Sequence, residues 1–89
     1  MYAVFVKVRI DPTRLEEARK ALQEDVVPRA KAVPGFVKGT WFGDSESGHG
    51  LVLVDSEEQA QHMAGMVTAN PGDPAQIESV KVFQVHAEA

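Results

Sequence analysis

The side chains of this sequence best suited to proton transfer are three histidines, His49, His62 and His86. A neutral imidazole can accept a proton near neutral pH, so it can act as a general base or hold a ligand. His49 opens a strand-like run in phase with Leu51 and Leu53, and strand alternation places all three on one face of a sheet. We therefore take His49 as the candidate catalytic base. The simpler alternative is a structural histidine beside a glycine turn.

Three cations are expected on the same face as the aromatic residues Phe5 and Phe83. Lys7 and Arg9 share the phase of Phe5 in the first strand-like run, and Lys81 shares the phase of Phe83 in the last. If these two strands are neighbours, the cations cluster, and they could bind an anionic planar ligand or stabilise an enolate or oxyanion. Alternatively, they surround an interface and pair with acidic residues of a second copy. The acids available for such pairing are Asp44, Glu46 and Glu78.

Other kinds of site are disfavoured by what the sequence lacks. The chain has no cysteine, which excludes disulfides, thiol catalysis and thiolate metal sites. Its histidines do not occur at the short spacings of a metal centre, and no glycine-rich phosphate loop follows a strand. No serine has a recognisable paired base. We therefore expect neither a metal nor a cofactor.

Length and charge limit the class of protein. With 89 residues the chain is expected to form one domain, 1–89, which buries only roughly 60–65% of its unfolded surface. The net charge is −4 and no segment is dense in lysine or arginine, which disfavours nucleic acid and anionic membranes as partners. No stretch approaches the ~18 apolar residues of a membrane span, and no signal-peptide core is present. We expect a cytoplasmic protein.

The candidate residues must be positioned by a small set of elements. Alternation of apolar residues predicts a strand over 2–10. Apolar residues at steps of three and four predict a helix over 13–32, with Thr13 and Glu16 as a capping box. Pro28 should kink this helix or split off its last turn.

The rest of the chain predicts three further strands and a second helix. Ser56 and Gln59 form a further capping box at the start of a helix. The order is β-α-β-β-α-β, which predicts an α+β fold of the ferredoxin-like kind, with two helices on one face of a four-stranded antiparallel sheet. The expected elements are a strand at 36–43, a strand at 49–54, a helix at 57–69 and a strand at 76–86.

Both faces of this sheet are expected to be apolar. Aliphatic residues suit the helix-covered face, and Thr40 and Phe42 are assigned there too; the opposite phase offers Phe5, Trp41, Leu51, Leu53, Phe83 and Val85. Leaving such side chains in water forfeits roughly 1.5–3 kcal/mol each. An exposed apolar face marks an interaction site, and a second copy is the economical cover, sheet against sheet. In the competing phase assignment, Phe42 replaces Trp41 on that face. The aliphatics assigned to the helix side are Val4, Val6, Val8, Val52, Val54, Val80 and Val82.

This layout resembles the dimeric α+β barrel superfamily, and most closely its antibiotic-biosynthesis-monooxygenase type of small domain. The residues that carry the resemblance are the turn Pro34-Gly35-Phe36, the following Trp41 and the helix opening DSEEQAQHM at 55–63. The resemblance covers nearly the whole chain and implies a homodimer whose two sheets form a barrel, with a cavity in each protomer. Members include cofactor-independent oxygenases of aromatic polyketides, haem-degrading enzymes, lactone isomerases, dehydratases and proteins of no known activity.

The haem-degrading members use a helical histidine together with an asparagine on the first strand. This chain has no asparagine there, so we interpret His62 as a solvated helix residue. His86 is near the C-terminus, and we interpret it as a residue at the end of the last strand.

Two functions remain open from the sequence. The first is a cofactor-independent, monooxygenase-like enzyme or a binder of a small hydrophobic or aromatic ligand. Its walls would be Phe5, Trp41, Leu51, Leu53 and Phe83, its base His49, and its anion-stabilising group Lys7 or Arg9. The second is a non-catalytic dimeric module whose barrel is filled by side chains. RNA binding, which uses the same order of elements, is disfavoured because the third strand carries no Phe, Tyr or Trp.

Overall fold

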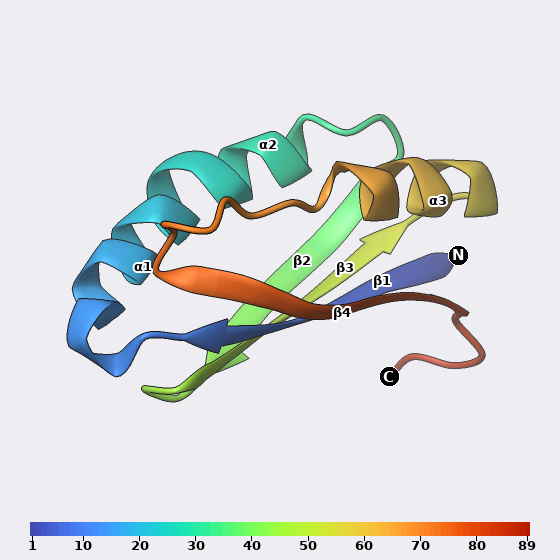
Figure 1. Ribbon diagram of the computed structural model, residues 1–89. Coiled ribbons are helices and arrows are strands. Elements are labelled where there is room, and N and C mark those ends of the chain that lie inside the picture. The colour runs from blue at the N-terminus through green and yellow to red at the C-terminus, as the bar shows by residue number, and fades with distance from the viewer.

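The computed structural model, which describes residues 1–89, has an α+β architecture with one antiparallel sheet of four strands in the order β2-β3-β1-β4. Figure 1 shows the helices on the same side of this sheet. The predicted order of elements is confirmed, and the arrangement is compatible with a ferredoxin-like fold. The elements are β1 (Tyr2–Ile10), η1 (Pro12–Arg14), α1 (Leu15–Ala21), η2 (Leu22–Val26), α2 (Val27–Lys31), β2 (Phe36–Gly43), β3 (Ser47–Val54), α3 (Glu57–Met66) and β4 (Ala75–Gln84).

The first helical layer runs without a break from η1 to α2, although it contains Pro28. A proline has no N–H to donate, and in a regular α-helix its ring clashes with the carbonyl four residues earlier, here that of Glu24. The chain widens at this point into the π-helical turn η2, in which the Val27 N–H bonds to the Leu22 carbonyl. The effect of Pro28 is therefore a widened turn before it, and the last turn is not split off.

The helix starts were predicted with mixed success. Asp11, not Thr13, caps the first helical layer, because its carboxylate accepts from the Thr13 N–H at 3.0 Å and from the Thr13 hydroxyl at 2.7 Å. The predicted capping box of Thr13 and Glu16 is therefore wrong. At the second helix the predicted cap is confirmed, since the Gln59 N–H donates to the Ser56 hydroxyl at 3.3 Å. This helix, α3, ends at Met66, three residues earlier than predicted.

The turn between β2 and β3 is tighter than the polar stretch 43–48 suggested. One oxygen of Asp44 accepts from the backbone N–H groups of Glu46 and Ser47, at 2.9 and 2.8 Å, and from the Ser47 hydroxyl at 3.0 Å. These bonds let β3 begin at Ser47, two residues before the predicted start. They also lower the pKa of the Asp44 carboxyl.

The core lies between the sheet and the helices. Its centre is formed by Val4 and Val54, which are fully buried, with Ala60 and Met63 of α3 packed over them. The predicted assignment of the valines to the helix side is confirmed for the members of this cluster and for those packed against it. These are Val4, Val6, Val52, Val54, Val80 and Val82.

Trp41 lies on the helix-covered face, and the expectation that it faces the opposite side is wrong. It is paired with Gly50 across the β2–β3 ladder and packs against the core. Its indole lies over two glycines: a Cβ atom at Gly39 would be 2.6 Å from its ring, and one at Gly50 would be 2.9 Å from its Nε1. The assignment of Thr40 and Phe42 to this face is therefore also wrong, because they alternate with Trp41 along the strand.

The two glycines under Trp41 generate a stability prediction. Gly39→Ala should lower the free energy of unfolding by about 1–3 kcal/mol, because the added methyl group displaces a packed ring. The matched control is Gly65→Ala in α3, where an added Cβ meets no atom within 4 Å and the helix gains up to about 1 kcal/mol from alanine. Urea unfolding followed by tryptophan fluorescence measures both. Equal stability of the two variants would contradict the placement of Trp41.

Candidate functional site

The sheet surface opposite the helices, called here the open face, carries large apolar side chains with no cover in this chain. The exposed fractions are 51% for Phe42, 50% for Phe83 and 38% for Leu51. Strand pairing places Phe5, Leu53 and His49 on the same face, because Leu51 is opposite Phe5 and His49 is opposite Phe42. Figure 1 shows no helix on this side of the sheet. A surface that exposes several large apolar side chains is typical of an interaction or binding site.

Three rings form a row across β2, β3 and β1 on the open face, near the turn between β2 and β3. His49 on β3 stacks on Phe42 of β2, with ring centroids 5.2 Å apart and planes at 12°. It also stacks on Phe5 of β1, at 5.9 Å and 20°. Because the rings are nearly parallel, the imidazole has a phenyl ring on each side. We call these three residues the ring row.

The nitrogen atoms of His49 differ in their surroundings. Nδ1, which is the nearer to the backbone, is buried and has no hydrogen-bond partner. Nε2 is at the other side of the imidazole and is not buried. A buried polar atom without a partner costs free energy, and such exceptions call for an explanation, often a functional one. Nε2 is thus the atom of the ring row that is available to a ligand.

The open face carries four cations, three of them on β1 and β4 and one further along β2. Lys7 is paired with His49 across β1 and β3, and Lys81 is paired with Phe5 across β1 and β4. Arg9 follows two residues along β1, next to Ser47, and Lys38 lies opposite Leu53. The expectation that Lys7, Arg9 and Lys81 share one face is therefore confirmed.

These cations are free of ion pairs within the chain. The three ion pairs that the structure contains all belong to the first helical layer and lie far from the open face. They join Arg14 to Glu17, Arg19 to Glu16 and Arg29 to Asp25. Lys7, Arg9, Lys38 and Lys81 are thus available to an added group.

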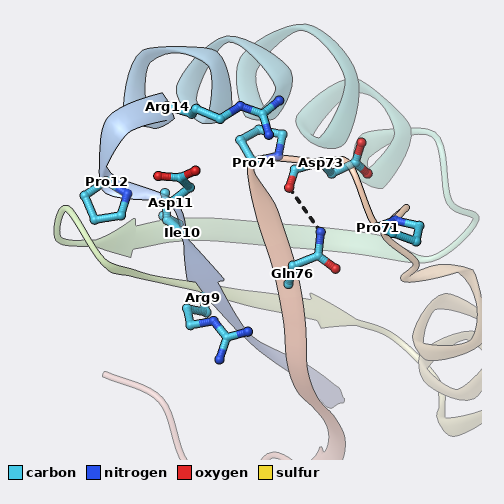
Figure 2. A pocket seen from close by; sticks show the side chains of 9 residues that line it. All are labelled: Arg9, Ile10, Asp11, Pro12, Arg14, Pro71, Asp73, Pro74 and Gln76. Atoms are coloured by element: carbon cyan, nitrogen blue, oxygen red, sulfur yellow. Dashed lines mark hydrogen bonds between the residues drawn. The ribbon is translucent and has the colours of Figure 1, made fainter.

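Two hollows of the surface lie away from the ring row. The larger, of about 370 Å³, lies beside the end of β1 and the start of β4 (Figure 2). Most of its polar groups are already engaged: Arg14 pairs with Glu17 and donates to the Gly72 carbonyl at 2.9 Å, and Gln76 donates to the Asp73 carbonyl at 3.0 Å. Arg9, which also lines it, extends away from Arg14 in Figure 2. Its lining residues are Arg9, Ile10, Asp11, Pro12, Arg14, Pro71, Asp73, Pro74 and Gln76.

The smaller hollow, of about 270 Å³, lies between the end of α2 and α3 and includes His62. His62 is thus on the helical side of the molecule, away from His49, as the sequence suggested. His86 lies beyond the end of β4 and is exposed. Of the three histidines, only His49 belongs to the open face.

Most of the predicted site residues meet on one face. The structure places His49, Lys7, Arg9, Phe5, Leu51, Leu53 and Phe83 there. Trp41 is not among them. The sequence placed Phe42 on this face only in the competing phase assignment, and Lys38 was not recognised as one of its cations. Gly39 and Gly50 are the signal for the face on which Trp41 lies. One precedes Trp41 by two residues and the other is paired with it across the ladder, so both leave room for its ring on their own face.

Comparison of the chain with protein-family models, with curated proteins and with solved structures finds no match in any of the three. The structure contains no helix that is both long and apolar enough to cross a bilayer. It also contains no group of three or more His, Asp or Glu side chains that could hold a metal ion. The open face is therefore the feature from which a function can be inferred.

Proposed function

We propose that the chain works as a homodimer in which two open faces meet, and that a small planar aromatic ligand binds between them. The observation that carries this proposal is the ring row, with Nε2 of His49 available between two phenyl rings on an uncovered apolar surface. Aromatic walls with a few polar groups are typical of small-molecule sites. Two sheets facing each other would enclose such a site as a barrel, as in the superfamily that the sequence resembles.

The small core supports a second copy as the cover. Only nine of the 89 residues are buried, and Val4 and Val54 are the largest fully buried side chains. Covering Phe42, Phe83 and Leu51 adds about half of the roughly 1.5–3 kcal/mol that full burial of an exposed large apolar side chain contributes, because each is already about half buried or more. In a two-fold dimer each copy contributes the same apolar surface to the interface, so the assembly is closed and no further copy can add to it. A second copy therefore covers the open face without any further partner.

His49 is the proposed base of an oxygenase-like reaction. In this reaction an aromatic substrate with an acidic CH₂ group loses one proton to Nε2, and its carbanion adds O₂. The proton then returns to give a hydroperoxide, which loses water and leaves a ketone. Lys7, opposite His49, is positioned to stabilise the negative charge of the carbanion. No metal is needed in this sequence of steps.

A filled barrel is the second candidate. Phe5, Phe42, Leu51, Leu53 and Phe83 are large, and two copies of each could pack to normal interior density without a ligand. The protein would then be a non-catalytic dimeric module. The half-exposed Phe42 and Phe83 favour a filled barrel, because both side chains have room to change orientation when two copies meet.

RNA binding by the open face is disfavoured by the geometry of the rings. RNA-recognition sheets present aromatic ring faces on which bases stack. In the ring row, Phe5 and Phe42 occupy both faces of His49, so the imidazole has none left for a base. The net charge of −4 also opposes a polyanion.

Dimerisation through the open face predicts the effect of Phe42→Ala. Removing this ring should weaken self-association by about 2 kcal/mol or more if it is central to the interface. The protomer itself should lose only about 1 kcal/mol, since the ring is half exposed and stacks on His49. Sedimentation velocity over a range of concentrations measures the first effect, and urea unfolding the second.

The matched control is Met66→Ala, which removes an exposed apolar side chain from α3, on the other side of the sheet. It should leave self-association unchanged. A wild-type chain that stays monomeric, or a Met66 variant that dissociates as readily as the Phe42 variant, would contradict the proposed interface.

The oxygenase-like activity predicts the effect of His49→Phe. Phenylalanine keeps an aromatic ring between Phe5 and Phe42 but removes both nitrogens, so the dimer should persist while catalysis is lost. The measurement is oxygen uptake with a panel of phenolic and anthrone-like substrates, with sedimentation as the check on assembly. General-base catalysis contributes about 10²–10⁴-fold, so the rate should fall by that factor. Undiminished turnover would reject His49 as the base, and no turnover by the wild type would favour the filled barrel.

A further inference from the structure

The open face and the whole chain have opposite charge. The chain carries 9 basic and 13 acidic residues, for a net charge of −4. Four of the basic residues lie on the open face, and the only acid within the four strands is Glu78, at the irregular pairing of β4 with β1. The open face is therefore a cationic surface on an acidic protein. Its cations are Lys7, Arg9, Lys38 and Lys81.

Two of these cations flank the ring row closely. Lys7 is opposite His49, and Lys81 is opposite Phe5, which is two residues before Lys7 on β1. Lys7 and Lys81 thus occupy diagonal positions on neighbouring strands, where long side chains can reach a common group. Neither forms an ion pair within the chain.

We infer that the ligand held between two open faces is an anionic aromatic compound, a carboxylate or a phenolate, and that its negative charge draws the two copies together. This inference rests on the proposed homodimer. A two-fold axis brings two sets of the same cations to one interface, and like charges brought together there repel. An aromatic anion offsets this repulsion at Lys7 and Lys81, while its ring extends the apolar contacts of Phe5 and Phe42.

The competing arrangement is that the partner's acids neutralise the cations. The candidates are Glu78 and the two acids of the β2–β3 turn, Asp44 and Glu46. One oxygen of Asp44 already accepts three hydrogen bonds within its own turn. The two arrangements predict opposite effects of salt: screening weakens a dimer held by ion pairs, and strengthens one opposed by repulsion.

The test is sedimentation velocity on the full chain with two probes of similar shape, 1-naphthoate and the neutral 1-naphthalenemethanol, at equal ionic strength. Acetate serves as an anion without an aromatic ring. We expect naphthoate to tighten the dimer about tenfold or more relative to either comparison compound. Without a probe, added sodium chloride should tighten the dimer.

Variants identify the cations. Lys7→Gln combined with Lys81→Gln should dimerise more tightly than the wild type without a probe and should lose the preference for naphthoate. The matched control is Lys20→Gln combined with Lys31→Gln, which makes the same change of charge on the helical layer and should behave as the wild type.

Each contrary outcome has a distinct meaning. A dimer that salt weakens and naphthoate leaves unchanged overturns the anion inference but keeps the homodimer. Equal effects of naphthoate and its neutral analogue, or of naphthoate and acetate, also overturn it. A chain that remains monomeric under every condition overturns the proposed function itself. Tight binding of oligouridylate by the monomer, abolished by Phe5→Ala, would assign the open face to RNA and overturn both.

Discussion

The helices cover one face of a sheet that carries large apolar side chains on both faces, and this mismatch governs the rest of the structure. A solvated sheet face normally alternates polar residues with the buried ones. Here the phase opposite the core supplies Phe5, Phe42, Leu51 and Phe83. A chain with so few buried residues has little stability to lose, because native stability is a small difference between large terms. Leaving this apolar surface in water therefore costs a significant share of it.

The ring row and the cations take their meaning from this uncovered surface. In one chain, His49 is a half-buried imidazole with an unpartnered Nδ1 between two phenyl rings. In the proposed dimer, the same imidazole would be a polar group of an apolar compartment. The charges of Lys7 and Lys81 would then determine which ligands can enter. The proposal thus links fold, assembly and chemistry through one surface.

The spacing of apolar residues and the positions of glycine and proline at turns were sufficient to predict the order of elements and most of the open face. They could not decide the phase of β2, because Trp41 and Phe42 are adjacent and either ring suits an apolar face. The space left by Gly39 and Gly50 decides it, and this depends on which strands are neighbours. The cap at Asp11 and the π-helical turn before Pro28 were not predicted either. Each depends on the local backbone geometry, and the sequence offers several residues that suit such a position equally well. The stacking of His49 required the register of three strands.

Intermolecular nuclear Overhauser effects, in a sample of mixed isotope-labelled and unlabelled chains, would show whether two open faces meet. This measurement reports which protons of one copy lie near protons of another, whatever the ligand. We expect contacts from the rings of Phe5 and Phe42 and from the methyl groups of Leu51. Contacts that arise instead from Met66 and the helical side, or no contacts at concentrations where the chain sediments as a dimer, would contradict this arrangement.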